Sequence, residues 1–104
     1  MISPDGKYSL TANVNRSELG HSNYGMVVLD LYNLEDSSHF MLNTRIGDMM
    51  KWSVGWYNDS TVVTQSSDVG TRAWLVIGTE LKSAQPSDEM EYFAKWLKTE
   101  KYGE

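Results

Sequence analysis

The 104-residue sequence contains no cysteine and only two histidines, His21 and His39. Without cysteine, the chain can form neither a disulfide framework nor a thiolate metal site. A zinc site would need a third ligand, and the two histidines show no HxH or HExxH spacing. We therefore expect a protein without a bound metal and without a cofactor.

Long apolar runs are also missing. No run approaches the ~18 residues of a membrane-spanning helix. The N-terminal MISPDGK lacks the charged start and the apolar segment of a secretory signal. These absences predict a cytoplasmic protein with no membrane contact. The length of 104 residues is typical of one domain, which we expect to cover residues 1–104.

Basic residues are few, since 9 Lys and Arg stand against 14 Asp and Glu and give a net charge of -5. This balance argues against a nucleic-acid partner, because phosphates require basic side chains. It favours a basic partner protein, whose approach an acidic surface would steer. The alternative is that the charge only keeps the protein soluble.

The stretch Lys51–Ile77 holds three of the four tryptophans and predicts three antiparallel strands. Trp52, Val54 and Trp56 alternate with small or polar residues, which places them on one face of a strand. The residues Asn58-Asp59-Ser60 favour a tight turn. The remaining expected segments are strands at Thr61–Thr64 and Ala73–Ile77, a turn at Ser66–Gly70 and a polar connection over Thr79–Pro86.

The first half of the chain predicts further strands. Tyr8–Val14 alternates between apolar and polar residues, as a half-buried strand does. Met26–Tyr32 is rich in Val and Leu, which predicts a central strand buried on both faces. The other expected segments are a polar loop at Asn15–Tyr24, a short strand at His39–Thr44 and a connection at Arg45–Met50.

Residues Ser87–Lys101 predict a helix. Ser87 can cap its N-terminus, and acidic residues follow in the first turn, where the helix dipole favours negative charge. An apolar stripe at helical spacing most simply packs on a sheet, although it could also bind a partner. The members of this stripe are Met90, Phe93, Ala94 and Leu97.

These elements predict the α+β class, with an antiparallel sheet of five or six strands, joined as hairpins or a meander, and one C-terminal helix covering a face. The alternative architecture is a β-sandwich to which the helix is appended. Both follow from runs of strands that end in a single helix.

Two segments repeat the same order of turn and strand. The SPDG of residues 3–6 precedes Tyr8–Val14, and the turn within Trp56–Ser60 precedes Thr61–Gln65. Each pair is followed by another strand, and GMVVLDLYNLED resembles the second and third strands of a PD40 or WD40-type β-propeller blade. The resemblance covers about half of the chain. A propeller needs at least about four blades, so the resemblance implies blade-like hairpins and not a closed propeller.

Catalytic motifs are not evident. His21 and His39 could act as acid and base in a ribonuclease-like site, but the sequence offers no Lys or Arg cluster beside them to hold a phosphate. Two ordinary surface imidazoles are the simpler interpretation. We therefore expect a protein that is not an enzyme and has no catalytic residues.

A small acidic chain without cysteine and without catalytic motifs is similar to bacterial immunity proteins, which block a cognate toxin that is often a basic nuclease. The resemblance lies in size, charge and lack of chemistry. It implies an inhibitor that binds and neutralises a basic toxin domain. The alternatives are a propeller-blade-like structural or protein-interaction module, which could be a fragment of a longer chain, and a small His-dependent enzyme.

Partner-binding residues of such an inhibitor are expected in turns, where the scaffold holds side chains outward. Tyrosine is enriched at interface centres, and acidic groups raise the rate of association with a basic partner. For each candidate, the alternative is an ordinary solvated turn. The candidates are Glu18, Tyr24, Tyr57, Asp59 and Asp68.

Overall fold

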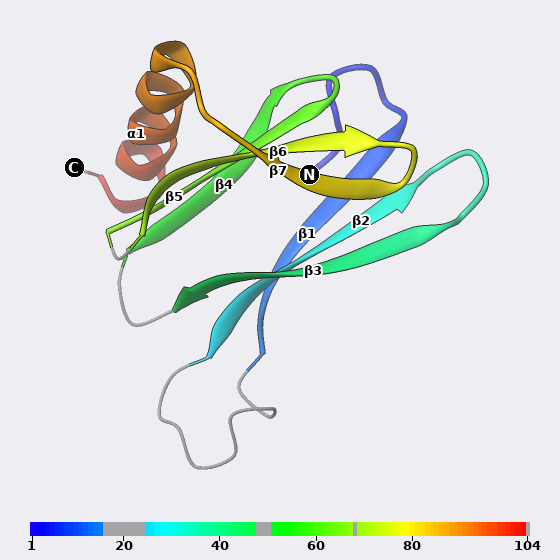
Figure 1. Ribbon diagram of the computed structural model, residues 1–104, viewed down its shortest axis with the longest axis horizontal. Coiled ribbons are helices and arrows are strands. Elements are labelled where there is room, and N and C mark those ends of the chain that lie inside the picture. The colour runs from blue at the N-terminus through cyan, green and yellow to red at the C-terminus, as the bar shows by residue number, and fades with distance from the viewer. Residues whose placement is uncertain (16–24, 48–50, 68, 104) are drawn as a thin grey trace.

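The computed structural model describes residues 1–15, 25–47, 51–67 and 69–103. Over these residues the chain forms seven β-strands followed by one α-helix (Figure 1). The elements are β1 (Tyr8–Asn15), β2 (Met26–Asn33), β3 (His39–Gly47), β4 (Trp52–Asn58), β5 (Thr61–Ser66), β6 (Gly70–Ile77), β7 (Glu80–Ala84) and α1 (Asp88–Tyr102).

The strands form two antiparallel sheets and not one. The three-stranded sheet has the order β1-β2-β3, and the four-stranded sheet has the order β4-β5-β6-β7. The α+β class is therefore confirmed, whereas the expectation of five or six strands in a single sheet is wrong. The two sheets face each other, and α1 covers the other face of the four-stranded sheet, which gives three layers (Figure 1).

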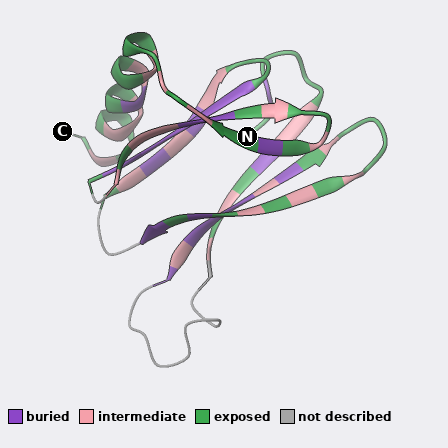
Figure 2. Ribbon diagram, viewed as in Figure 1, coloured by how far each residue is buried: buried purple, intermediate pink, exposed green. Residues whose placement is uncertain are grey.

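A shared apolar layer lies between the two sheets. It is built from side chains at alternate positions of both sheets, since period two sends every second residue to one face. Figure 2 shows buried stretches along strands of both sheets, while the turns are exposed. The fully or nearly fully buried members of the layer are Leu10, Val27, Leu29, Leu31, Ile46, Val62, Trp74 and Leu81.

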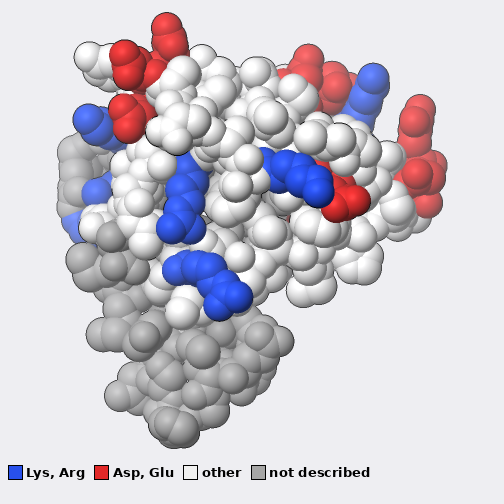
Figure 3. Space-filling model, in the orientation of Figure 1, with Lys and Arg blue, Asp and Glu red and all other residues white. Residues whose placement is uncertain are grey.

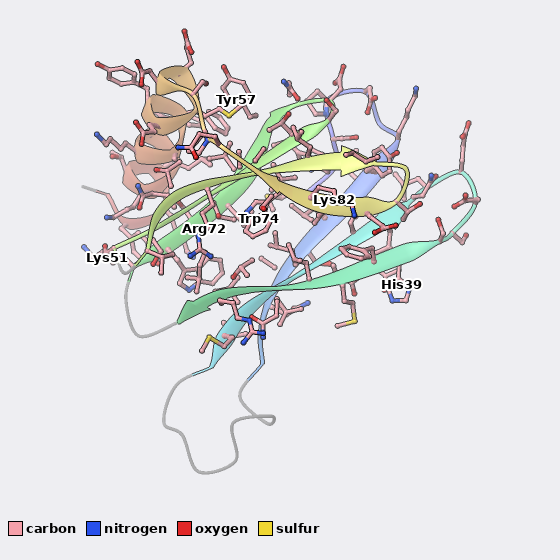
Figure 4. The ribbon with its side chains drawn as sticks, viewed as in Figure 1. His39, Lys51, Tyr57, Arg72, Trp74 and Lys82 are labelled. Carbon is pink, nitrogen blue, oxygen red and sulfur yellow. The ribbon has the colours of Figure 1, made fainter. Side chains whose placement is uncertain are left out.

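One polar contact here ties the two sheets together, and another satisfies a buried donor within the four-stranded sheet. The Arg72 guanidinium of β6 donates a hydrogen bond to the backbone carbonyl of Thr44 in β3, at 2.9 Å. The neighbouring inward side chain, Trp74, donates from its indole nitrogen to the hydroxyl of Thr64, at 3.0 Å. Both side chains point from the four-stranded sheet towards the three-stranded one (Figure 4). The buried indole is thus satisfied, as a buried donor must be.

The strand β7 lies where a polar connection over Thr79–Pro86 was expected, and that expectation is wrong. A two-residue loop, Gly78-Thr79, reverses the chain between the paired residues Ile77 and Glu80. Gly78 has φ of 66°, which glycine accepts at the first position of a short hairpin loop. The new strand buries Leu81 in the shared layer.

The strand β3 also runs further than expected, ending at Gly47 and not at Thr44. Its pairing with β2 shifts register between Met26 and Val28, and Arg45 adopts φ of 64° beside this irregularity. A bulge of this kind lets a strand continue after a bend, which a sequence pattern of strict alternation does not reveal.

The central strand β2 is buried on its inner face, where Leu29 and Leu31 are fully covered. The expectation of burial on both faces is only partly met. On the outer face Val28 is buried, but Tyr32 is 39% exposed, because no described element covers this side of the three-stranded sheet. Asp30 lies on that same outer face and is half-buried.

The helix prediction is confirmed. Ser87 caps α1 by accepting a hydrogen bond from the Met90 backbone at 3.2 Å, and Gly103 ends the helix in the left-handed conformation. Ala94 is fully buried against the four-stranded sheet. Over the described residues, no helix has the length and apolar character needed to cross a membrane.

Close approach of α1 to β4 depends on Gly55. A Cβ atom at this position would lie 2.9 Å from both terminal carbons of Leu97, which is closer than carbon atoms pack. The absence of a side chain at Gly55 therefore lets Leu97 rest directly on the backbone of β4.

We predict that Leu97→Ala lowers the free energy of unfolding by about 2 kcal/mol, the lower end for a Leu that is only partly buried. Gly55→Ala should destabilise the wild-type protein because the new methyl group meets Leu97. The same substitution should cost less when Leu97 is already Ala, giving a coupling of at least ~0.5 kcal/mol in a double-mutant cycle measured by urea melts. Strictly additive effects would contradict this packing.

Candidate functional site

The structure places two of the five predicted partner-binding residues. Glu18, Tyr24 and Asp68 lie outside the described residues. Tyr57 and Asp59 both belong to the β4–β5 hairpin.

Tyr57 and Asp59 differ in their surroundings. The Tyr57 ring packs edge-on against Phe93 of α1, with centroids 5.5 Å apart, and is half-buried beside the helix (Figure 4). Its ring therefore packs against the helix. The sequence pattern predicted that this side chain projects outward from the turn, which it does not. Asp59 is exposed at the tip of the hairpin, as expected of a partner-binding group.

Asp59 shares one end of the sandwich with three other turns. In an antiparallel meander alternate turns lie at the same end, and the two sheets are aligned so that their turns meet (Figure 1). We call this end the acidic turn end. Its turns comprise residues 3–7, 34–38, 58–60 and 78–79.

Hydrogen bonds hold these turns against one another. The Leu34 backbone donates to the carbonyl of Lys7 at 2.9 Å, which joins the first two turns. The hydroxyl groups of Ser38 and Thr79 lie 3.0 Å apart and join the two sheets. These contacts fix the relative positions of turns that are far apart in sequence.

Tyr8 makes a second connection between the sheets at this end. Its hydroxyl donates to the carbonyl of Gly78 at 2.8 Å. Its ring lies 6.3 Å from that of Trp56, whose strand leads directly into the β4–β5 turn. The first, third and fourth turns are therefore held around one aromatic side chain.

Exposed carboxylates dominate the acidic turn end. Figure 3 shows acidic side chains at the upper right and right of the molecule, where these turns lie, and a separate group at the upper left over α1. The basic side chains are Lys7 and Lys82, and the Lys82 ammonium lies 3.6 Å from the Glu80 carboxylate. The carboxylates of these turns are Asp5, Glu35, Asp36 and Asp59, and Glu80 follows the fourth turn as the first residue of β7.

Two of these carboxylates are fixed by their own turns. Asp5 accepts hydrogen bonds from the Ser3 hydroxyl at 2.7 Å and from the Lys7 backbone at 3.2 Å, which lower its pKa. Asp36 accepts from both the hydroxyl and the backbone of Ser38, at 2.6 and 2.9 Å, which lower its pKa as well. Both side chains are therefore charged and oriented at neutral pH.

A groove of about 510 Å³ lies along another part of the molecule, between β1, β4 and the C-terminal turn of α1. The Lys101 ammonium sits 3.3 Å from the centroid of the Trp52 ring and donates to the Trp52 carbonyl at 2.8 Å. Such a cation–π contact stabilises both groups. It fixes the last turn of the helix at the mouth of the groove.

The groups that could carry other chemistry are few among the described residues. His39 is exposed on β3, and its ring stacks on Tyr32 with centroids 4.9 Å apart (Figure 4). His21 lies outside the described residues. Where the structure describes the chain, no three His, Asp or Glu side chains gather as metal ligands would.

Comparison with known proteins adds no relative: no protein-family model, no curated protein and no solved structure matches this chain.

The sequence-based candidates included Asp59 but not the four carboxylates that the structure places at the same end. The turn motifs SPDG and NLED already mark Asp5, Glu35 and Asp36 as turn residues, and that signal was available. Their convergence with Asp59 depends on how two separate sheets are aligned, and no local pattern encodes this alignment.

We predict a pH-dependent contribution of Asp5 and Asp36 to stability. Their pKa values are depressed below the usual 3.8 in the folded protein, so the contribution is present above that value and is lost as pH falls through the folded pKa. The stability difference between wild type and an Asp5→Asn, Asp36→Asn variant should be constant from about pH 5 to 7 and shrink below about pH 4.

Urea melts across this pH range measure the difference. Ser3→Ala with Ser38→Ala is the matched control, because it removes the hydroxyl donors while leaving both carboxylates. This variant should retain only part of the pH-dependent contribution. A wild-type and Asn-variant difference that does not change with pH would contradict the assignment.

Proposed function

We propose that the protein is an immunity-type inhibitor that binds a basic toxin domain, of the nuclease class, through the acidic turn end. The observation that supports this most directly is the convergence of four exposed carboxylates from three turns, together with Glu80, which follows the fourth turn, on two sheets. A nuclease domain carries a basic surface to hold nucleic-acid phosphates. A fixed array of carboxylates is complementary to such a surface.

The rigidity of the turn end favours binding. Asp5 and Asp36 are held by hydrogen bonds within their own turns, and the turns are bonded to one another. Little conformational freedom is therefore lost when a partner binds, which improves affinity. The concentrated negative charge also steers a basic partner and raises the association rate.

Apolar groups at the same end can supply the desolvated part of an interface. Leu34 is 50% exposed beside Glu35, and Ile77 is 56% exposed immediately before the β6–β7 turn. Protein interfaces combine an apolar centre with a polar rim. The two side chains provide apolar contact next to the carboxylates.

A second candidate function is a propeller-blade-like interaction module. It is favoured by the arrangement of β1-β2-β3 and β5-β6-β7, which are two antiparallel meanders in sheets packed face to face. Such a module would bind through its scaffold and its strand edges, without need of the acidic turn end.

Reversing the charge at the acidic turn end should distinguish the inhibitor function from the interaction-module function. We predict that Glu35→Lys with Asp59→Lys slows association with the basic toxin domain by at least tenfold at low salt, because steering is lost. Both side chains are exposed, so the fold should be unaffected. The measurement is stopped-flow or surface-plasmon kinetics against a basic nuclease toxin domain, with one encoded by a neighbouring gene as the first choice.

The matched control is Glu89→Lys with Glu100→Lys, which changes the net charge equally but on exposed positions of α1. It should alter the association rate far less. In cells, co-expression with the toxin should be protective for wild type and the control variant and less so for the turn variant. Equal cell death with and without the protein would contradict the immunity function and leave the interaction module.

A further inference from the structure

The two sheets differ by one strand. In the four-stranded sheet, β4 lies along the outer edge of β5, the first strand of the meander β5-β6-β7. In the three-stranded sheet, β1 is the first strand of the corresponding meander, and among the described strands it pairs only with β2. Over the described residues, no strand therefore lies along the outer edge of β1, whereas β4 covers the counterpart in the other sheet.

The first residues of the chain begin to cover this edge. Met1 and Leu10 exchange two backbone hydrogen bonds, at 2.8 and 2.7 Å, and Ile2 forms an antiparallel bridge with Ser9. An additional strand along β1 is thus already started, in antiparallel orientation and in a defined register.

Beyond Leu10 the edge of β1 continues without a described strand beside it. In an antiparallel strand the backbone N–H and C=O groups of alternate residues point to the same side. Leu10 directs its groups outward to Met1, so Ala12 and Val14 direct theirs outward too. An edge of this kind is a template for another extended chain.

The groove lies directly beside this part of the edge. Its walls include Thr11 and Ala12 of β1, Trp52 and Val54 of β4, and Leu97 of α1. The side chains of Trp52 and Val54 are only half-buried, although they belong to the inner face of their sheet. A strand beside β1 would lie opposite β4 and complete the burial of both.

The corresponding edge of β4 is closed at this point by the helix. The Tyr102 hydroxyl accepts from the backbone N–H of Trp52 at 3.0 Å and donates to its carbonyl at 2.9 Å. The backbone of Trp52 is therefore not available to an incoming strand, whereas no described strand pairs with the outward groups of Ala12 and Val14.

We propose that the edge of β1 from Ala12 to Val14, together with the groove, binds an extended segment of a partner protein as a fourth strand of the three-stranded sheet. The segment runs antiparallel to β1 in the register set by Met1 and Leu10. It carries apolar residues opposite Ala12, which lines the groove, and opposite Val14 beyond it, and polar residues between them. This site is separate from the acidic turn end and does not depend on the proposed inhibitor function.

A second copy of this chain fits the edge poorly. Met1 already occupies the edge at Leu10, so two β1 strands could pair only beyond that point. Such a short overlap buries little surface, whereas a single extended peptide can use both the edge and the groove. A small molecule would leave the outward backbone groups of Ala12 and Val14 unpaired.

The test uses a fluorescein-labelled nonapeptide in which Val and Thr alternate, followed by anisotropy and by amide NMR of the protein. The peptide should bind and slow hydrogen exchange of the Ala12 and Val14 amides by at least tenfold, because these become paired. N-methylation of the Val residues should abolish binding, since their N–H groups face β1. N-methylation of the Thr residues should leave binding within about twofold, since theirs face away.

Variants of the protein provide a second, independent test of peptide binding. Ala12→Pro removes the outward N–H without breaking the β1–β2 ladder, as proline does on an edge strand, and should weaken the peptide at least tenfold. Glu35→Lys with Asp59→Lys should leave peptide binding unchanged. Equal effects of the two methylation patterns, no binding at millimolar peptide, or a homodimer that Ala12→Pro dissociates would each overturn the proposal.

Discussion

The apolar layer between the two sheets is the constraint on which the rest of the structure depends. A sheet must bury its apolar face against another element, and the opposing sheet covers Leu10, Leu29 and Leu31 of the three-stranded one. The Arg72 contact to Thr44 and the Tyr8 contact to Gly78 then fix how one sheet lies over the other. This alignment creates both proposed binding surfaces. It brings four turns to one end and leaves a groove that β1 and β4 both line.

Local patterns predicted the secondary structure well where one physical signal dominated. The helix followed from its cap, its dipole-compatible charges and its apolar stripe, and the β4–β5 hairpin from alternation around Asn58 and Asp59. The division into two sheets could not be predicted in this way. Alternation shows that Trp52, Val54 and Trp56 share a face, but it does not show which strands lie opposite. Strand β7 was not predicted because its sequence is mostly polar. The two-residue loop beginning at Gly78 was nevertheless a sequence signal for a hairpin.

The residues of the candidate site likewise fall into those that a local pattern predicts and those that depend on tertiary packing. Asp59 was accessible to sequence reasoning because exposure at a hairpin tip is a local property. Tyr57, two residues earlier, was assigned to the turn, whereas strand periodicity directs its ring towards α1 and Phe93. The open edge of β1 was invisible to the sequence, because it appears only when the two sheets are compared strand by strand. Glu18, Tyr24 and Asp68 lie outside the described residues, and their part in binding stays a prediction.

The packing of Leu97 on Gly55 has an evolutionary consequence. Because the two terminal carbons of Leu97 occupy the space that a Cβ at Gly55 would need, a side chain at position 55 requires Leu97 to move. In any divergent relative, a larger residue at position 55 should be accompanied by a smaller one at position 97. Such paired substitution would link the hairpin and the helix, which are 42 positions apart along the chain at this contact. It would serve as a signature for recognising distant members of this fold when overall sequence similarity has been lost.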